Sequence, residues 1–177
     1  MLEPKPNLLR DLSIQEADQV WGIDITYIRM KRGFMYLFVI IDWYSRLIID
    51  YELSSTLDKG FVLTCLERAF RQRKPGILNS DQGGHFTNAD YIALLQRNGI
   101  RISMDGKGRA TDNAITERFF RTLKYECIFL NEFPTPRDLR HGINDFMHKY
   151  NTQRIHQSLD YITPAEAYGL SVDKAAC

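Results

Sequence analysis

The chain has few cysteines, and their spacing excludes two common ways of stabilising a small protein. Its 177 residues include only Cys65, Cys127 and Cys177, which lie far apart and form no CxxC pair. An odd number of widely spaced cysteines suggests neither a disulfide framework nor a zinc site. We therefore expect a protein of a reducing compartment.

Long hydrophobic runs are also missing. No run reaches the roughly 18 apolar residues of a membrane-spanning helix, and the first residues, MLEPKPNLLRDL, contain no apolar stretch of signal-peptide length. Internal repeats and low-complexity segments are absent as well. These features predict a soluble, intracellular protein.

The chain carries no strong excess of either charge. It has 23 basic and 22 acidic residues, of which 7 basic and 9 acidic fall in residues 1–60 (−2) and 16 and 13 in residues 61–177 (+3). A surface for a polyanion should therefore be local and lie on the later part of the chain. With 44% hydrophobic residues, the chain can bury one sizeable core, which predicts a single domain.

The pattern of apolar residues predicts a mixed α/β fold. Short runs rich in β-branched and aromatic residues predict strands at 20–29, 34–42, 46–54, 77–80 and 100–104. Amphipathic segments ended by glycine or proline predict helices at 58–72, 89–98, about 112–130 and 137–150. Short connections favour an antiparallel meander for the first three strands, and the whole order indicates a mixed sheet covered by helices.

Three acidic residues occupy positions that are poorly suited to stability alone. Asp24 lies in the middle of the strand VWGIDITYI, where an ionised carboxylate is costly unless a cation compensates it. It is therefore either a paired structural acid or part of a site. Asp81 ends a short apolar strand before Gly83 and Gly84, where an Asx-turn is the simpler interpretation. Glu117 lies on the predicted helix DNAITERFFRTLKYE.

The pattern of that helix separates two faces. One is an apolar stripe formed by Ile115, Phe119, Leu123, Cys127 and Leu130. The other brings together Asn113, Glu117, Arg121 and Lys124. A capping box does not explain Glu117, because Ala114 stands three residues before it.

The three acids together could form a metal site. A strand acid, an acid at the end of a neighbouring strand and an acid on a covering helix could converge into a cluster that repels itself unless cations fill it. Hard oxygen ligands suit Mg²⁺ or Mn²⁺. Two such ions, about 3.5 to 4 Å apart, activate the attacking oxygen and stabilise the leaving oxygen in phosphoryl transfer.

Four segments resemble the retroviral-integrase-like transposases of bacterial insertion sequences. They are WGIDITYI, NSDQGGHFT, DNAITERFFRTLKYE and the tail YNTQRIHQSLDYITPAEAY. Asp24, Asp81 and Glu117, with 35 residues between the last two, are similar to the family's D, D(35)E signature. The resemblance covers residues 19 to 168.

The resemblance implies a fold, an activity and a cofactor. The expected fold is a ribonuclease H-like, mixed five-stranded sheet flanked by helices, in which Asp24, Asp81 and Glu117 hold two Mg²⁺ or Mn²⁺ ions. The expected activity is cleavage of DNA at the ends of an element, followed by joining of the 3′-hydroxyl to another phosphodiester. The partners would be double-stranded DNA and further copies of the chain, in the cytoplasm and associated with the nucleoid.

Basic residues suggest where DNA would bind. Lys124 matches the family's basic residue near the scissile phosphate, and Arg121, Asn113, Lys107 and Arg109 lie close to the proposed site in the sequence. The cluster from Arg68 to Lys74 is better explained as a solvated face. His85 is better explained as structural, while Arg154 and His156 match the family's tail and are candidates for a DNA or subunit contact.

The family pattern also predicts how the chain is divided. Residues 1–18 form a leader, 19–130 the catalytic core and 131–177 a helical extension of the same domain. Met1 lies only 23 residues before Asp24, which leaves no room for the helix-turn-helix that family members carry upstream. We expect an excised or truncated catalytic domain, or a partner of a separately encoded recognition segment. The alternatives are a non-catalytic DNA-binding or oligomerisation module, and a nuclease that cannot join strands.

Overall fold

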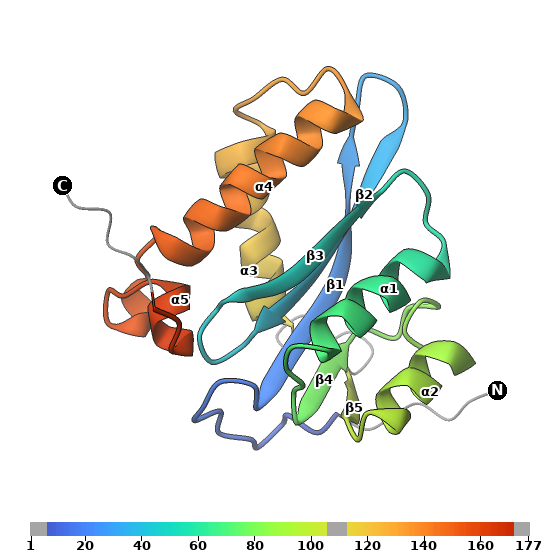
Figure 1. The fold of residues 1–177 in the computed structure, drawn as a ribbon, viewed down its shortest axis with the longest axis vertical. Coiled ribbons are helices and arrows are strands. Elements are labelled where there is room, and N and C mark those ends of the chain that lie inside the picture. Colours follow the sequence, from blue (N-terminus) through green and yellow to red (C-terminus); the bar gives the residue numbers. More distant parts are fainter. Residues whose placement is uncertain (1–6, 106–112, 172–177) are drawn as a thin grey trace.

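The computed structural model describes residues 7–105 and 113–171 and is built around one five-stranded sheet (Figure 1). The strands lie in the order β3-β2-β1-β4-β5. Their bounds are β1 Val20–Arg29, β2 Phe34–Asp42, β3 Ile48–Ser54, β4 Ile77–Ser80 and β5 Arg101–Met104. The predicted meander is confirmed, because β1, β2 and β3 pair antiparallel, whereas β4 and β5 run parallel to β1.

The third strand begins later than the sequence predicts. The Asp42 carboxylate accepts hydrogen bonds from the Ser45 backbone (2.8 Å) and hydroxyl (2.6 Å), which closes a turn after β2. Arg46 then adopts a left-handed conformation with φ of 65°, so regular pairing resumes only at Ile48.

Helices cover both faces of the sheet, and the sequence marks where most of them begin. Their bounds are α1 Lys59–Phe70, α2 Ala89–Arg97, α3 Ala114–Leu123, a π-helix η1 Lys124–Ile128, α4 Pro136–Thr152, a short 3₁₀ segment η2 Gln157–Leu159 and α5 Pro164–Tyr168. Asp58 caps α1, and Thr135 with Asp138 forms a capping box at α4. Gly99 ends the α2 region at φ of 71°, as its position predicts.

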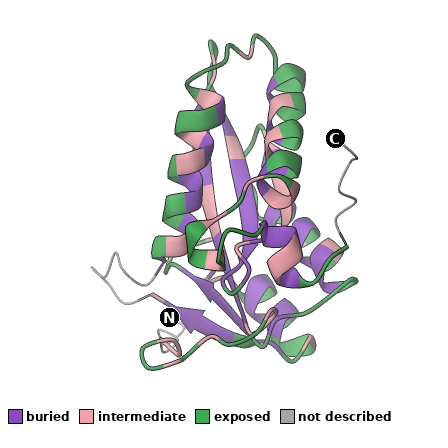
Figure 2. Ribbon diagram, turned by 90° about the vertical axis from the view of Figure 1, so that its left-hand side faces the viewer, coloured by how far each residue is buried: buried purple, intermediate pink, exposed green. Residues whose placement is uncertain are grey.

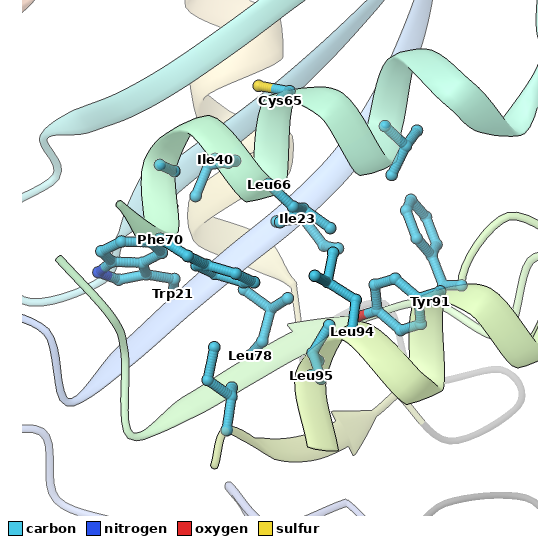
Figure 3. Close-up of a cluster of buried hydrophobic side chains, with 14 of the residues drawn as sticks. Trp21, Ile23, Ile40, Cys65, Leu66, Phe70, Leu78, Tyr91, Leu94 and Leu95 are labelled. Atoms are coloured by element: carbon cyan, nitrogen blue, oxygen red, sulfur yellow. The ribbon is translucent and has the colours of Figure 1, made fainter. Parts of the chain in front are cut away.

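The two faces of the sheet bury separate hydrophobic cores. Trp21 and Ile23 of β1 pack with Leu66 of α1 and Leu95 of α2 (Figure 3). Val20 and Ile28 pack on the opposite face with residues of α3 and α4. Figure 2 shows buried residues along the strands and on the inner sides of the helices. Because side chains alternate along a strand, Asp24 shares the α3 face, while Ile23 and Ile25 anchor the other face.

The end of the predicted 112–130 helix is wrong in one respect. Leu130 was expected in the apolar stripe, but 73% of its surface is exposed. The regular helix stops at Leu123 and continues as a π-helix through Ile128. The wider turn of a π-helix changes the phase of the stripe, and the helical segment ends before Leu130.

The segments before and after the predicted catalytic core pack against it. Leu8, Leu9, Leu12 and Ile14 contact the core beneath α3 and α4. Helix α4 adds Leu139, Ile143 and Met147 to that same core. Within residues 7–105 and 113–171, no helix is long and apolar enough to cross a membrane.

Candidate active site

Three acidic residues lie near the level at which the parallel strands β4 and β5 end, with Asp24 in the middle of β1 and Asp81 and Asp105 directly after β4 and β5. Gly22 pairs with Asn79, so continuing that register by two residues brings Asp24 level with Asp81. Ser80 pairs with Met104, so one further step brings Asp81 level with Asp105. All three acids then lie on the α3 face, since each is an even number of residues from a residue on that face.

Helix α3 brings Glu117 to the same region. A Cβ atom on Gly22 would lie 2.8 Å from the hydroxyl oxygen of Thr116, which shows that β1 and α3 approach each other closely there. Thr116 is fully buried, and Glu117 follows it on the first turn of α3 with an exposed side chain. The absence of a side chain at Gly22 thus permits the approach that places Glu117 near Asp24.

Asp24 is the most perturbed of these acids. Its carboxylate is half-buried and, among residues 7–105 and 113–171, accepts one hydrogen bond, from the backbone of Ile25 (2.8 Å). The pKa of Asp24 is raised to about 7, mainly by burial, with a smaller contribution from the negative charges of Asp81, Glu117 and Asp105 and against the lowering effect of the Ile25 hydrogen bond. Asp24 therefore lies within electrostatic range of both other predicted site acids.

The acids surround a common region without forming a ready set of ligands. Asp81 is exposed, and its Oδ1 accepts a hydrogen bond from the Gly83 backbone (2.8 Å), which is the Asx-turn that the simpler interpretation predicted. In the described part of the chain, no three His, Cys, Asp or Glu residues are grouped closely enough to hold a metal ion. The assignment of Asp24, Asp81 and Glu117 as metal ligands stays a prediction.

Asp105 also belongs to this region, although it is not among the acids predicted from the sequence. Its carboxylate accepts a hydrogen bond from Asn79 (2.8 Å), and its backbone bonds to Ser80 (3.0 Å) and to the side chain of Gln82 (3.0 Å). These bonds tie the end of β5 to the segment that carries Asp81. Its place directly after a strand, like that of Asp81, was the available signal.

Several buried oxygen atoms in this region lack a partner among the described residues. They are Oδ1 of Asn79, Oδ1 of Asn113 and Oγ1 of Thr116. Asn79 and Thr116 are fully buried, and Asn113 is 5% exposed. Buried polar atoms without partners call for an explanation, and carboxylate, amide and hydroxyl oxygens are the donors that Mg²⁺ or Mn²⁺ accepts. The residues present therefore fit a divalent cation.

The predicted DNA-contacting residues differ in their surroundings. Arg121 is exposed, and its guanidinium lies 5.6 Å from the centre of the Tyr125 ring. The Lys124 ammonium lies 5.7 Å from the centre of the Tyr27 ring. Neither forms an ion pair with another described residue. Asn113 is buried and so is less accessible than its predicted role requires. Lys107 and Arg109 lie outside the described residues.

The other basic candidates have partners within the chain. Arg68 forms ion pairs with Asp50 (2.7 Å) and Glu52 (2.8 Å), which agrees with the non-functional interpretation of its cluster. Arg154 pairs with Glu126, and the His156 ring lies edge-on to Tyr150 at 5.2 Å. These contacts hold Arg154 and His156 against the rest of the chain, and their assignment to a DNA or subunit contact stays a prediction.

Comparison with protein families identifies relatives over nearly the whole chain. Two family models, both described as an integrase core domain, match residues 15–110 and residues 98–164. The putative transposase InsK of insertion sequence element IS150 from Escherichia coli K12 is 34% identical over 165 residues, covering 91% of this chain and 58% of that protein. The transposase of IS904 from Lactococcus lactis is 36% identical, and the match covers 92% of this chain and 66% of that protein. The chain thus spans only part of the length of these curated relatives.

Solved structures share the fold. The catalytic core domain of HTLV-2 integrase in complex with magnesium aligns with a TM-score of 0.69 and 16% identity, covering 86% of this chain and 97% of that one. A chain of a simian T-cell lymphotropic virus intasome in complex with a PP2A regulatory subunit aligns with a TM-score of 0.74 and 17% identity. The alignment covers 98% of this chain and 60% of that one. At such identities the likeness concerns the fold alone, and it confirms the predicted ribonuclease H-like fold.

Proposed function

The chain belongs to the integrase core domain family, which it shares with insertion-sequence transposases, and from this premise we propose that Asp24, Asp81 and Glu117 form the active site of a metal-dependent polynucleotidyl transferase. The observation that carries the proposal is the position of Asp24. It is half-buried in β1, Asp81 directly follows the neighbouring strand β4, and the pKa of Asp24 is raised by burial and by the charges of Asp81 and Glu117. Such an arrangement is costly for stability and is typical of functional sites.

Divalent cations would compensate this cost. Asp24, Asp81 and Glu117 would hold two Mg²⁺ or Mn²⁺ ions, with Asp105 and the buried Oδ1 of Asn79 beside them. When bound, such ions supply positive charge to the attacking and leaving oxygens of a phosphodiester. The magnesium complex of HTLV-2 integrase supports this choice of cation.

The proposed reaction has two transfers of a phosphoryl group. In cleavage, a water oxygen bonds to phosphorus at the end of the element, the bond to the 3′-oxygen breaks, and that oxygen leaves as a hydroxyl. In joining, the freed 3′-hydroxyl attacks another phosphodiester and displaces its 3′-oxygen, so no bond to the protein forms. Arg121 and Lys124, beyond Glu117 on the same helical segment, would hold phosphates beside the acids, and Asn113, Lys107 and Arg109 are proposed to assist.

The proposed partners follow from the relatives. The substrate would be double-stranded DNA, both element ends and target. HTLV-2 integrase cores described as trimeric and dimeric support assembly of several copies. The curated relatives extend beyond the matched segment, which supports a helix-turn-helix recognition segment supplied separately or by a longer chain. The proposed location is the bacterial cytoplasm, with the nucleoid.

The test is cleavage and joining of a labelled DNA duplex in Mg²⁺ or Mn²⁺. Asp81→Asn should lower both rates by roughly a thousandfold, because the charge stabilisation involved is worth several kcal/mol. Asp145→Asn, at an exposed acid of α4, is the matched control and should react at the wild-type rate.

Two results would decide for the alternatives. If wild type and Asp81→Asn behave alike, the acids are not catalytic, and unchanged DNA binding by Glu117→Gln would then identify a non-catalytic module. Nicking without any joining would identify a simple nuclease.

A further inference from the structure

An aromatic pair stands in solvent on the β1–β2 hairpin. Tyr27 and Phe34 meet edge to face, with ring centres 5.7 Å apart and an interplanar angle of 85°. Tyr27 is 65% exposed and Phe34 is 48% exposed, although both lie in regular strands of the sheet. Large aromatic side chains that remain exposed beside each other often mark a binding surface.

The same hairpin is positively charged and has no internal compensation. Arg29, Lys31 and Arg32 lie at its tip, all are exposed, and residues 25–41 contain no acid. None of the three forms an ion pair with another described residue. A fourth cation, Lys124, lies with its ammonium 5.7 Å from the Tyr27 ring centre. The partner of this surface should therefore carry negative charge.

Lys124 connects this surface to the candidate active site, because it follows Glu117 by seven residues on the helical segment over the Asp24 face and lies beside the Tyr27 ring. Tyr27 itself follows Asp24 by three residues on β1, about 10 Å along the strand, and its side chain leaves the opposite face of the sheet. Strand β4 pairs with β1 only as far as Gly22, so β1 has no strand neighbour on that side where Asp24 and Tyr27 lie. In Figure 1 the turn between β1 and β2 extends to one end of the molecule, away from α1 and α2.

We propose that Tyr27 and Phe34, with Arg29, Lys31, Arg32 and Lys124, form a binding site for unpaired nucleotides of a DNA strand. An exposed aromatic ring stacks on a nucleobase without regard to its identity, and the surrounding cations bind the phosphates on either side. In a duplex the faces of the bases are covered by the stacked neighbouring base pairs, so the ligand is an opened or single-stranded segment. The site rests on the proposed function, because it takes DNA as the substrate, and it holds an opened strand at the part of β1 that follows Asp24.

The test measures DNA binding without catalysis. Fluorescence anisotropy in EDTA compares a blunt duplex with the same duplex carrying a tail of about four unpaired nucleotides. Tyr27→Ala should weaken binding of the tailed duplex by roughly tenfold and change the blunt duplex little, because stacking on one base is lost. Tyr27→Phe keeps the ring and should bind like wild type.

A matched control lies at the other end of the β1–β2 strand pair. Tyr44 is 40% exposed and follows β2, and Tyr44→Ala should bind both DNAs like wild type. The double variant Lys31→Ala, Arg32→Ala should weaken both DNAs and lower the salt dependence of binding, since those cations contact phosphates. Thermal melts would verify that all variants fold.

Three results would overturn the inference. In the first, Tyr27→Ala binds the tailed duplex as tightly as wild type. In the second, Tyr27→Ala and Tyr27→Phe lose the same amount of affinity for it. In the third, Tyr27→Ala changes only self-association, measured by sedimentation velocity. The last would make the aromatic pair an interface between copies of the chain. Binding is measured without divalent metal, so the two proposals are tested separately. Loss of cleavage in Asp81→Asn tests the proposed active site, and loss of tail binding in Tyr27→Ala tests the nucleotide-binding site.

Discussion

Gly22 of β1 lies directly against Thr116 of α3, so close that a Cβ atom on the glycine would stand 2.8 Å from the threonine hydroxyl oxygen and closer still to the indole nitrogen of Trp43. All of Thr116 and most of Trp43 are buried, so neither can move aside into solvent. This contact sets the distance between the strand that carries Asp24 and the helix that carries Glu117. A single missing side chain thereby couples packing to the geometry of the candidate site.

Gly22→Ala should disturb both stability and activity. The added methyl group forces α3 away from β1, and overpacking of this kind costs about 1 to 3 kcal/mol. We expect the melting temperature to fall by roughly 3 to 10 °C and DNA cleavage to fall with it. Gly84→Ala is the control for stability, because a Cβ atom there meets nothing within 4 Å. Equal melting temperatures for the two variants would contradict the close approach.

Mn²⁺ should raise the melting temperature of the wild-type chain. Cations that bind the folded acids stabilise the folded state by mass action, and at about 100 times the dissociation constant the gain is about 2.7 kcal/mol. Asp24→Asn should shrink the shift, while Asp145→Asn should keep it. Scanning fluorimetry with increasing Mn²⁺ measures the melting temperature of each variant. A shift in Asp24→Asn equal to that of wild type would show that Asp24 does not bind the cation.

The metal-free protein should lose stability as the pH rises from about 4 to 7. Burial, together with the charges of Asp81 and Glu117, raises the pKa of Asp24 to about 7, compared with about 3.9 in an unfolded chain. The folded state therefore binds more protons across this range, and the free energy of unfolding decreases with pH. In EDTA, the melting temperature should decline less steeply with pH for Asp24→Asn than for wild type or Asp145→Asn. Parallel curves would contradict the raised pKa.

Asp105 should act as a positioning residue for the acids. Asp105→Ala leaves the buried Asn79 amide without its 2.8 Å acceptor, at a cost of about 1 to 3 kcal/mol. Asp105→Asn keeps an acceptor oxygen and should melt close to wild type, yet it removes a negative charge near Asp24. We expect it to need more Mn²⁺ for the same thermal shift. If both variants match wild type in melting and in Mn²⁺ response, Asp105 has no part in the site.

Much of the fold could be predicted from the sequence because local patterns decide it. Short runs rich in β-branched and aromatic residues placed the strands 20–29, 34–42 and 77–80 where the structure has them. Gly99 marked the end of α2 and Pro136 the start of α4, because the backbone preferences of glycine and proline act within a few residues. The π-helix at Lys124–Ile128 was missed, since no local signal distinguishes it from a regular helix, and the exposure of Leu130 followed from that error.

The identities of the candidate acids were likewise available in the sequence, as Asp24, Asp81 and Glu117 stand in recognisable motifs at a recognisable spacing. Their mutual arrangement was decided by the tertiary structure alone. The register between β1, β4 and β5 adds Asp105 to the same level, and the fold buries Asn113. It also brings Lys124 over Tyr27, 97 positions earlier in the chain. These contacts join residues that are distant in sequence. They are set by the register of the strands and by the packing of the α3 segment on the sheet, and no short stretch of sequence encodes either.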